Sequence, residues 1–335
     1  DVAHYCRKAI SIRGFMVNMS ALPQLKPIKI SDLQQRYTRA HITQNYDRIA
    51  HGVVITKAEQ TADAPFQHDI ISRARAHHLN NPKAIVSHWA AAAYAGLTYW
   101  ANEAQVTLLV ESGRHTSHSR LQPHRQAKSA ATATWTPDPA FPMLRCVTPA
   151  LATIQCIKDV VRGNHTWFVH RVPGLAPEEI RSIQLIDAMR RCTGITPYDV
   201  LSSGYGIISA RMLQKLISLS DPQADSPQET TLRLIAFQVH DGLSTQIPIY
   251  ARFPEGGYPR LLTQLDAGWR AYKVGLFYDG IHHLDRRQRD YDSMVTIQLH
   301  NMGWDTLRIT HGMLYNAREL QRNIAARINA RKSMP

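Results

Sequence analysis

The chain has 335 residues, of which 44% are hydrophobic, and this combination is sufficient for two or three packed domains and excludes a purely polar, disordered chain. The formal net charge of +13 favours an anionic partner such as nucleic acid over a small neutral substrate. A solvated basic surface without such a partner is the alternative.

The cysteines are few and widely spaced, and they form no CxxC pair. This spacing disfavours a disulfide scaffold or a zinc ribbon and predicts a chain of the reducing cytoplasm. The four residues are Cys6, Cys146, Cys156 and Cys192.

No membrane association is expected from the apolar runs of the chain. The most apolar run, residues 89–100, is far shorter than the roughly 20 residues needed to span a bilayer. The N-terminus lacks the pattern of a signal peptide. Residues before Met19 are expected to be an extension outside the first domain.

Residues 1–80 are predicted to hold this extension and a winged-helix-like region. Residues 30–55 follow the pattern helix, turn, helix and short apolar strand. Ser31 or Asp32 is suited to cap a helix, and Gly52 is suited to turn a wing. A small helical bundle with a hairpin fits the same pattern equally well.

Residues 81–220 are predicted to form a middle domain of mixed helical and β structure. An alanine-rich helix over 86–97 and a strand over 106–110 are followed by a polar loop. The irregular histidine spacing in this loop indicates a basic surface rather than a zinc site. Its basic residues are His115, His118, Arg120, His124 and Arg125. Further helices are expected over 150–161, 178–191, 197–201 and 209–218.

Residues 221–335 are predicted to form an α/β core with a mixed sheet, which makes the whole chain α+β. After a linker over 221–226, Ser226, Pro227 and Glu229 give the clearest helix start in the chain. An extended segment and a hairpin follow, with strands around Leu265 and over 274–277. A helix over 285–302, a strand over 303–310 and a basic C-terminal helix complete the pattern.

The hairpin carries acids and imidazoles near the ends of its strands. Asp266 lies in an otherwise apolar strand, where a carboxylate is costly unless it is paired or binds a metal. Asp279 ends the next strand, and His282 and His283 follow. Such groups can hold Mg²⁺ and take a proton from water, as in a metal-dependent nuclease.

Each of these residues also has a structural interpretation. Asp266 can serve a structural hydrogen bond, and Asp279 can belong to an Asp-Gly turn. Glu229 can complete a capping box instead of facing a metal. Because adjacent strand residues point to opposite faces, one of His282 and His283 is expected to enter the site.

Four cations near the hairpin are candidates for phosphate contacts in DNA. They equally suit a solvated helix face. These residues are Lys273, Arg286, Arg287 and Arg289.

The C-terminal part, from Ser226 to about residue 328, resembles the small domain related to the very-short-patch-repair endonuclease, a branch of the PD-(D/E)xK restriction-endonuclease fold. Residues 87–97 and 148–150 resemble the middle segment of abortive-infection-type antitoxins, which follows a winged helix in such proteins. The C-terminal likeness rests on Ser226, Pro227, Glu229, Asp266, Trp269, the run 277–283, Gly303, Trp304, Arg308 and Thr310.

The chain departs from the typical domain at Phe277, which stands where a metal-binding glutamate is usual. The mismatch-repair branch also lacks that glutamate; there the carbonyl of the next residue binds the metal and histidine transfers the proton. The resemblance thus implies Asp266, Asp279 and the Tyr278 carbonyl as ligands of Mg²⁺ or Mn²⁺. The motif lysine and the aromatic wedge for mismatches are absent, so mismatch specificity is not implied.

Two functions follow from these patterns. The first is a metal-dependent DNA endonuclease of repair, restriction or phage defence. The second is a non-catalytic DNA-binding antitoxin or regulator that retains a degenerate nuclease fold and binds a cognate toxin. An RNA-directed nuclease is a third function that the charge allows.

Overall fold

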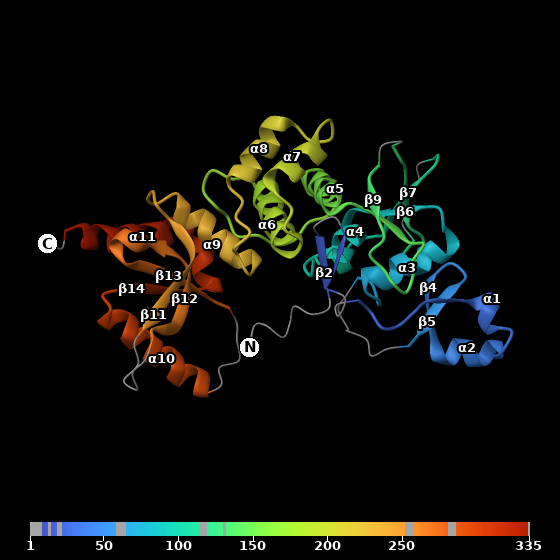
Figure 1. Cartoon of the computed structure of the whole chain (residues 1–335), viewed down its shortest axis with the longest axis horizontal. Helices are drawn as coiled ribbons and strands as arrows, with labels where there is room; N and C mark the ends of the chain where they lie inside the picture. The colour runs from blue at the N-terminus through green and yellow to red at the C-terminus, as the bar shows by residue number, and fades with distance from the viewer. Residues whose placement is uncertain are drawn as a thin grey trace. The chain divides into compact units, whose positions relative to one another are not determined.

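The computed structural model describes residues 9–12, 15–18, 22–57, 65–113, 119–129, 132–251, 258–280 and 286–333. Helices and mixed sheets make the chain α+β, which confirms the expected class (Figure 1). Within these residues, no helix has the length and apolar character needed to cross a membrane.

The chain forms two compact units. Unit 1 comprises residues 1–165 and 189–215, and unit 2 comprises residues 166–188 and 216–335. The boundary falls within helices α6 (Pro177–Thr193) and α8 (Ala210–Ser218). The three-part division at residues 80/81 and 220/221 stays a prediction.

Near its N-terminal end, unit 1 contains a small antiparallel sheet with strand order β3-β5-β4. Gly52 turns the β4–β5 hairpin with a φ of +69°, a conformation that favours glycine. Leu33, Ile42 and Val54 form a core between the helices and the sheet. The elements are β3 (Ile28–Lys29), α1 (Ile30–Leu33), α2 (Arg39–Asn45), β4 (Tyr46–Ala50) and β5 (Val53–Thr56), and they follow the hairpin β1 (Ala9–Ile12) and β2 (Phe15–Asn18).

A five-stranded sheet with order β8-β7-β6-β10-β9 forms the second part of unit 1. Strands β6 and β10 are parallel, as are β7 and β8, whereas β6 and β7 are antiparallel. The strands are β6 (Ile85–Ser87), β7 (Thr107–Val110), β8 (His124–Ala127), β9 (Thr134–Trp135) and β10 (Arg145–Val147). The helices of this unit include α3 (Ile70–Asn80), α4 (His88–Tyr94), η3 (Ala101–Glu103), α5 (Pro149–Val161) and α7 (Pro197–Gly204).

Two predictions for this part of the chain are wrong. The expected helix over 86–97 begins only at His88, because β6 occupies residues 85–87 and pairs on both sides. The expected polar loop contains strand β8, whose backbone pairs with the buried strand β7. Neighbouring backbone therefore decides the structure of both segments. His115 and His118 lie outside the described residues.

Unit 2 is built on a four-stranded sheet with order β11-β12-β13-β14. Strand β12 is antiparallel to both β11 and β13, whereas β14 is parallel to β13. In Figure 1, α9 and α11 lie above these strands and α10 lies below them. The elements are α9 (Pro227–Phe237), β11 (Ser244–Ala251), β12 (Arg260–Trp269), η4 (Arg270–Tyr272), β13 (Val274–Asp279), α10 (Arg286–Asn301), β14 (Asp305–Thr310), η5 (His311–Asn316) and α11 (Ala317–Lys332).

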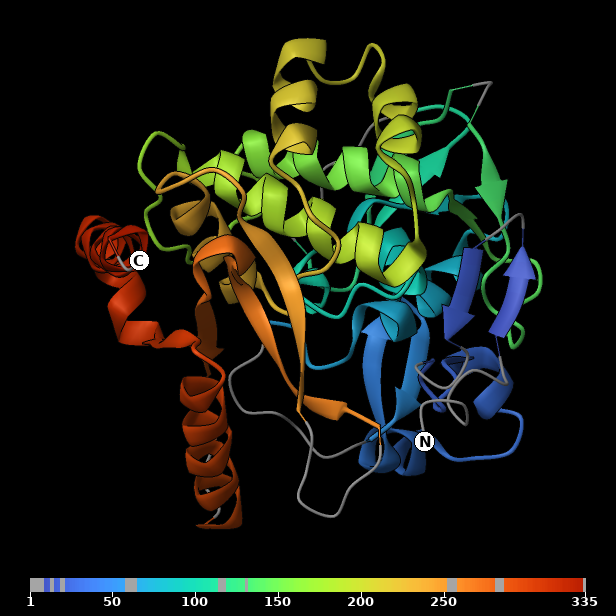
Figure 2. The ribbon, with the colours of Figure 1, turned by 60° about the vertical axis from the view of Figure 1, so that its left-hand side comes forward.

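One hydrophobic core cluster of unit 2 lies between this sheet and α10, and Figure 2 shows the helix along the strands. Ile247, Leu265, Val295 and Leu299 are among its buried side chains. The predicted start of α9 is confirmed, because Ser226 is the N-cap and Pro227 the first helical residue. The predicted β12–β13 hairpin is also confirmed.

A buried ion pair holds α9 against the part of α6 that belongs to unit 2. Arg233 donates from Nη2 to Asp187 Oδ2 over 2.8 Å. Asp187 also accepts from the Thr230 hydroxyl at 2.9 Å and from the Asp221 N–H at 2.7 Å. Three partners thus satisfy this carboxylate, as a buried charge requires.

Candidate functional site

The predicted acid of β12 lies at a distorted point of the sheet. Leu265 and Ala267 on either side of Asp266 are buried, and Gln246, on the neighbouring strand β11, has a φ of +46°. The Tyr278 N–H donates to Asp266 Oδ2 over 2.6 Å. This hydrogen bond fixes the carboxylate against the end of β13.

Burial above all, with the negative charges of Glu229 and Asp279, raises the pKa of Asp266 to about 7, although the hydrogen bond from the Tyr278 N–H lowers it. The three predicted acids therefore interact electrostatically. A carboxyl group that titrates near neutrality is typical of functional sites. We call Glu229, Asp266, Tyr278 and Asp279 the acidic edge.

Glu229 has the predicted capping role in α9. Its N–H donates to the Ser226 hydroxyl over 3.2 Å, and that hydroxyl donates to Glu229 Oε1 over 2.9 Å. Oε2 accepts from the Asp225 N–H at 2.8 Å and from Gln246 at 3.1 Å. The capping interaction and the coupling to Asp266 coexist, so the helix start also orients this carboxylate.

Asp279 is held by a residue that the sequence did not single out for this role. Arg308 on β14 donates from Nη1 to Asp279 Oδ1 over 3.0 Å, and its guanidinium lies 5.1 Å from the centre of the Phe277 ring. Parallel pairing places Phe277 opposite Arg308. Only this register brings the arginine to the acid, and no local pattern reveals it.

Phe277 packs against the core cluster of unit 2, so the position of the missing glutamate is occupied by an apolar side chain. Lys273, a predicted phosphate contact, has a φ of +49° and donates from Nζ to the Met302 carbonyl over 3.0 Å. This bond gives Lys273 a structural role at the end of α10.

The remaining predicted residues lie outside the described part of the chain. They are His282 and His283, together with the side chains of Arg286, Arg287 and Arg289. Within the described ranges, no three His, Cys, Asp or Glu side chains are grouped to hold a metal ion.

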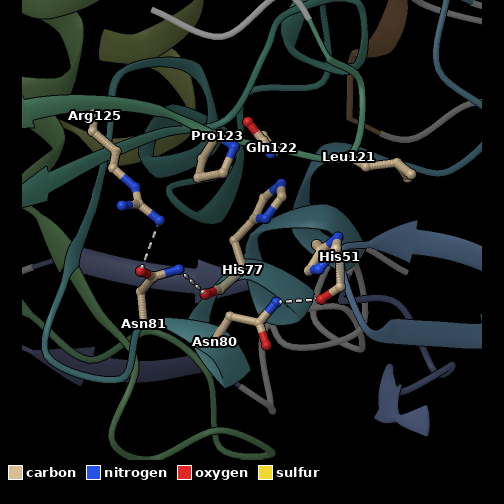
Figure 3. A pocket seen from close by; sticks show the side chains of 8 residues that line it. All are labelled: His51, His77, Asn80, Asn81, Leu121, Gln122, Pro123 and Arg125. Atoms are coloured by element: carbon tan, nitrogen blue, oxygen red, sulfur yellow. Dashed lines mark hydrogen bonds between the residues drawn. The ribbon is translucent and has the colours of Figure 1, made fainter. Parts of the chain in front are cut away.

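Unit 1 carries a separate pocket of about 540 Å³ that the sequence did not predict (Figure 3). It lies between the β4–β5 turn, the end of α3 and the segment that leads into β8. Asn80 donates to the His51 carbonyl over 2.7 Å, and Arg125 donates to Asn81 Oδ1 over 3.3 Å. The lining residues are His51, His77, Asn80, Asn81, Leu121, Gln122, Pro123 and Arg125.

His77 points into the middle of this pocket (Figure 3). Burial, together with the charges of Arg73 and Arg125, lowers the pKa of His77 to about 4, so its imidazole is neutral at pH 7. Among the described lining residues there is no carboxylate. Amides, imidazoles and one guanidinium suit a polar anion such as a phosphate group.

No protein-family model, no curated protein and no solved structure matches the chain.

Proposed function

We propose that unit 2 is a metal-dependent endonuclease domain that hydrolyses phosphodiester bonds in DNA. The observation that carries this proposal is the Asp266 carboxyl, which titrates near neutrality beside two further acids. Such an arrangement has a high electrostatic cost unless a cation relieves the repulsion. The acidic edge is therefore suited to a divalent cation.

The order of elements supports the same proposal. Helix α9, three antiparallel strands, helix α10 and the parallel strand β14 follow the pattern of the PD-(D/E)xK core that the sequence resembles. In that arrangement Asp266 and Asp279 come from adjacent strands, and Glu229 comes from the first helix.

The donor set of the acidic edge fits Mg²⁺ or Mn²⁺, because both ions prefer oxygen ligands. Asp266, Asp279 and the Tyr278 carbonyl would hold the ion, and water would complete its coordination, as is usual for Mg²⁺. The bound ion supplies positive charge to the scissile phosphate. His282 or His283 would take a proton from the attacking water.

DNA binding would involve both units. In unit 1, α1, α2 and the β4–β5 hairpin would act as the short helices and the wing of a winged-helix-like region, with β3 paired to β5. The pocket of Figure 3 adjoins the turn of this hairpin through His51 and would receive a backbone phosphate near Arg125. The positive charge of the chain favours such binding.

A second candidate is a DNA-binding antitoxin or regulator in which unit 2 is a non-catalytic scaffold and a cognate toxin is the partner. The packing of Phe277 into the core favours it, because this position supplies a metal ligand in the typical domain. The two candidates predict the same DNA binding but opposite results in a cleavage assay.

The test is incubation of the full chain with supercoiled plasmid, nicked, mismatched and single-stranded DNA in the presence of Mg²⁺ or Mn²⁺. We expect cleavage by the wild type and a loss of about 100-fold or more in Asp266→Asn, which keeps an acceptor for Tyr278. Asp241→Asn, at an exposed aspartate of the same unit, is the control and should cleave normally. Inert wild-type protein that still binds DNA would favour the regulator.

A further inference from the structure

Unit 1 contains a polar cleft beside β8 that shares only Arg125 with the pocket of Figure 3. The cleft consists of two adjoining cavities of about 430 and 380 Å³, which share Gln126, Asp159 and Asn164 as lining residues. Both volumes lie within the range of small-molecule sites, about 300–1,000 Å³.

A strained histidine supplies a fixed hydrogen-bond acceptor in this cleft. His88 is only 4% exposed and has a φ of +53°, in the left-handed region that residues with a Cβ seldom adopt. Its N–H donates to Gln155 Oε1 over 3.0 Å, which holds the strained backbone in place.

The hydrogen bonds of Ser87 determine which ring nitrogen of His88 carries the proton. The Ser87 hydroxyl donates its one proton to the Thr107 carbonyl over 3.0 Å, so it accepts from His88 Nδ1 at 2.9 Å. Burial lowers the pKa of His88 to about 3, so the ring is neutral. Nε2 therefore carries the lone pair and accepts a long hydrogen bond from the Gln126 amide nitrogen at 3.5 Å, which a donor group of a ligand would replace.

Asp159 of α5 adds a second acceptor. Burial raises the pKa of Asp159 to about 6, against a hydrogen bond from Asn164, so the carboxyl is mainly ionised at pH 7. The side-chain amides of Gln126 and Asn164 offer both donors and acceptors. Together these groups can bind the edge of a nucleobase, which also presents donors and acceptors side by side.

The remaining lining residues complete the walls of the cleft. Trp89, which is only 2% exposed, and His165 line the larger cavity, and their rings pack on each other with centroids 4.3 Å apart. Lys158 and Arg162 line the smaller cavity and offer positive charge to a phosphate.

We propose that this cleft binds a mononucleotide, with the base bound by His88, Asp159 and the amides, and the phosphate bound by Lys158 and Arg162. The proposal is independent of catalysis in unit 2. Asp266→Asn should therefore leave nucleotide binding unchanged.

The test is isothermal titration calorimetry of the full chain with AMP, GMP, CMP and UMP, and with inorganic phosphate alone. We expect at least one nucleotide to bind with a Kd below about 1 mM and more tightly than phosphate. His88→Asn should weaken binding about tenfold or more, because asparagine tolerates the positive φ but lacks Nε2. Arg162→Gln, at an exposed position, should weaken it severalfold.

Lys83→Met, at an exposed lysine of unit 1 outside the cleft, is the matched control and should bind as the wild type does. The proposal is overturned if no nucleotide binds at about 1 mM. It is also overturned if phosphate binds as tightly as the nucleotides, or if both cleft variants bind like Lys83→Met.

Discussion

Two aspartates of unit 2, the buried Asp187 and the half-buried Asp266, have pKa values raised for the same reason but have different surroundings. Burial raises the pKa of Asp187 to about 6 and that of Asp266 to about 7. Asp187 is compensated by Arg233, by the Thr230 hydroxyl and by the Asp221 N–H. Asp266 accepts one backbone hydrogen bond and faces two further negative charges.

The difference separates a structural acid from a candidate functional one. The partners of Asp187 offset much of the cost of burying its charge without any ligand, so this residue links α6 to α9. Among the described residues, no cation forms an ion pair with Asp266. A positively charged ligand would therefore gain more from Asp266 than from Asp187.

The largest expected effect comes from Asp187→Ala. The substitution leaves the buried Arg233 guanidinium without its carboxylate and should lower the free energy of unfolding by about 3–5 kcal/mol. Urea unfolding of the full chain, followed by circular dichroism and tryptophan fluorescence, measures this change. Asp305→Ala, which removes the exposed Arg327 pair in the same unit, is the control and should cost less than about 1 kcal/mol. Equal losses in both variants would remove the distinction between the two kinds of acid.

A smaller effect, with a defined pH dependence, is expected for Asp266→Asn. The folded pKa of about 7 lies above the unfolded value of about 3.9, so the folded state binds the extra proton between these values. In the wild type, the Asp266 carboxyl therefore contributes to the free energy of unfolding at low pH, and this contribution is lost as the pH rises through about 7. The asparagine variant has no such pH-dependent contribution, because its amide does not titrate.

The measurement is urea unfolding of both proteins at about pH 5 and about pH 8 without divalent cations. Between these conditions, Asp266→Asn should gain at least about 1 kcal/mol relative to the wild type. The same relative stability at both pH values would show that the Asp266 carboxyl is not perturbed.

The smallest effect on stability is expected for Arg308→Gln. Its ion pair with Asp279 is partly solvent-exposed, with side chains 34% and 38% exposed, so the loss should stay below about 1 kcal/mol. Removing the guanidinium also removes a competing cation, and we expect Mn²⁺ to bind severalfold more tightly. Arg327→Gln is the matched control because it breaks an Arg–Asp pair elsewhere in unit 2. Weaker Mn²⁺ binding in Arg308→Gln would show that Arg308 supports the site.

The elements that the sequence predicted correctly carry strong local signals. Ser226 and Pro227 mark the start of α9, and apolar runs mark β12 and β13. Strand β8 has a polar sequence, and its pairing with β7 supplies the structure that its own residues do not indicate. The helix predicted over 86–97 takes in Val86 and Ser87 of β6, because they directly precede the alanine-rich sequence of α4.

The acids of the site were predictable for the same reason. A carboxylate in an apolar strand stands out in a sequence, as Asp266 does. The role of Arg308 depends on the register of β13 and β14, and the pocket of Figure 3 collects residues from three distant segments. Tertiary packing alone brings these groups together, so no sequence pattern indicates them.

The most direct test of the acidic edge as a cation site is Mn²⁺ binding, followed by electron paramagnetic resonance, in the wild type, Asp266→Asn and Asp187→Asn. We predict that the wild type and Asp187→Asn bind Mn²⁺ alike and that Asp266→Asn binds about tenfold more weakly or not at all. Wild-type binding that survives unchanged in Asp266→Asn, or no binding at about 1 mM Mn²⁺, would contradict the assignment.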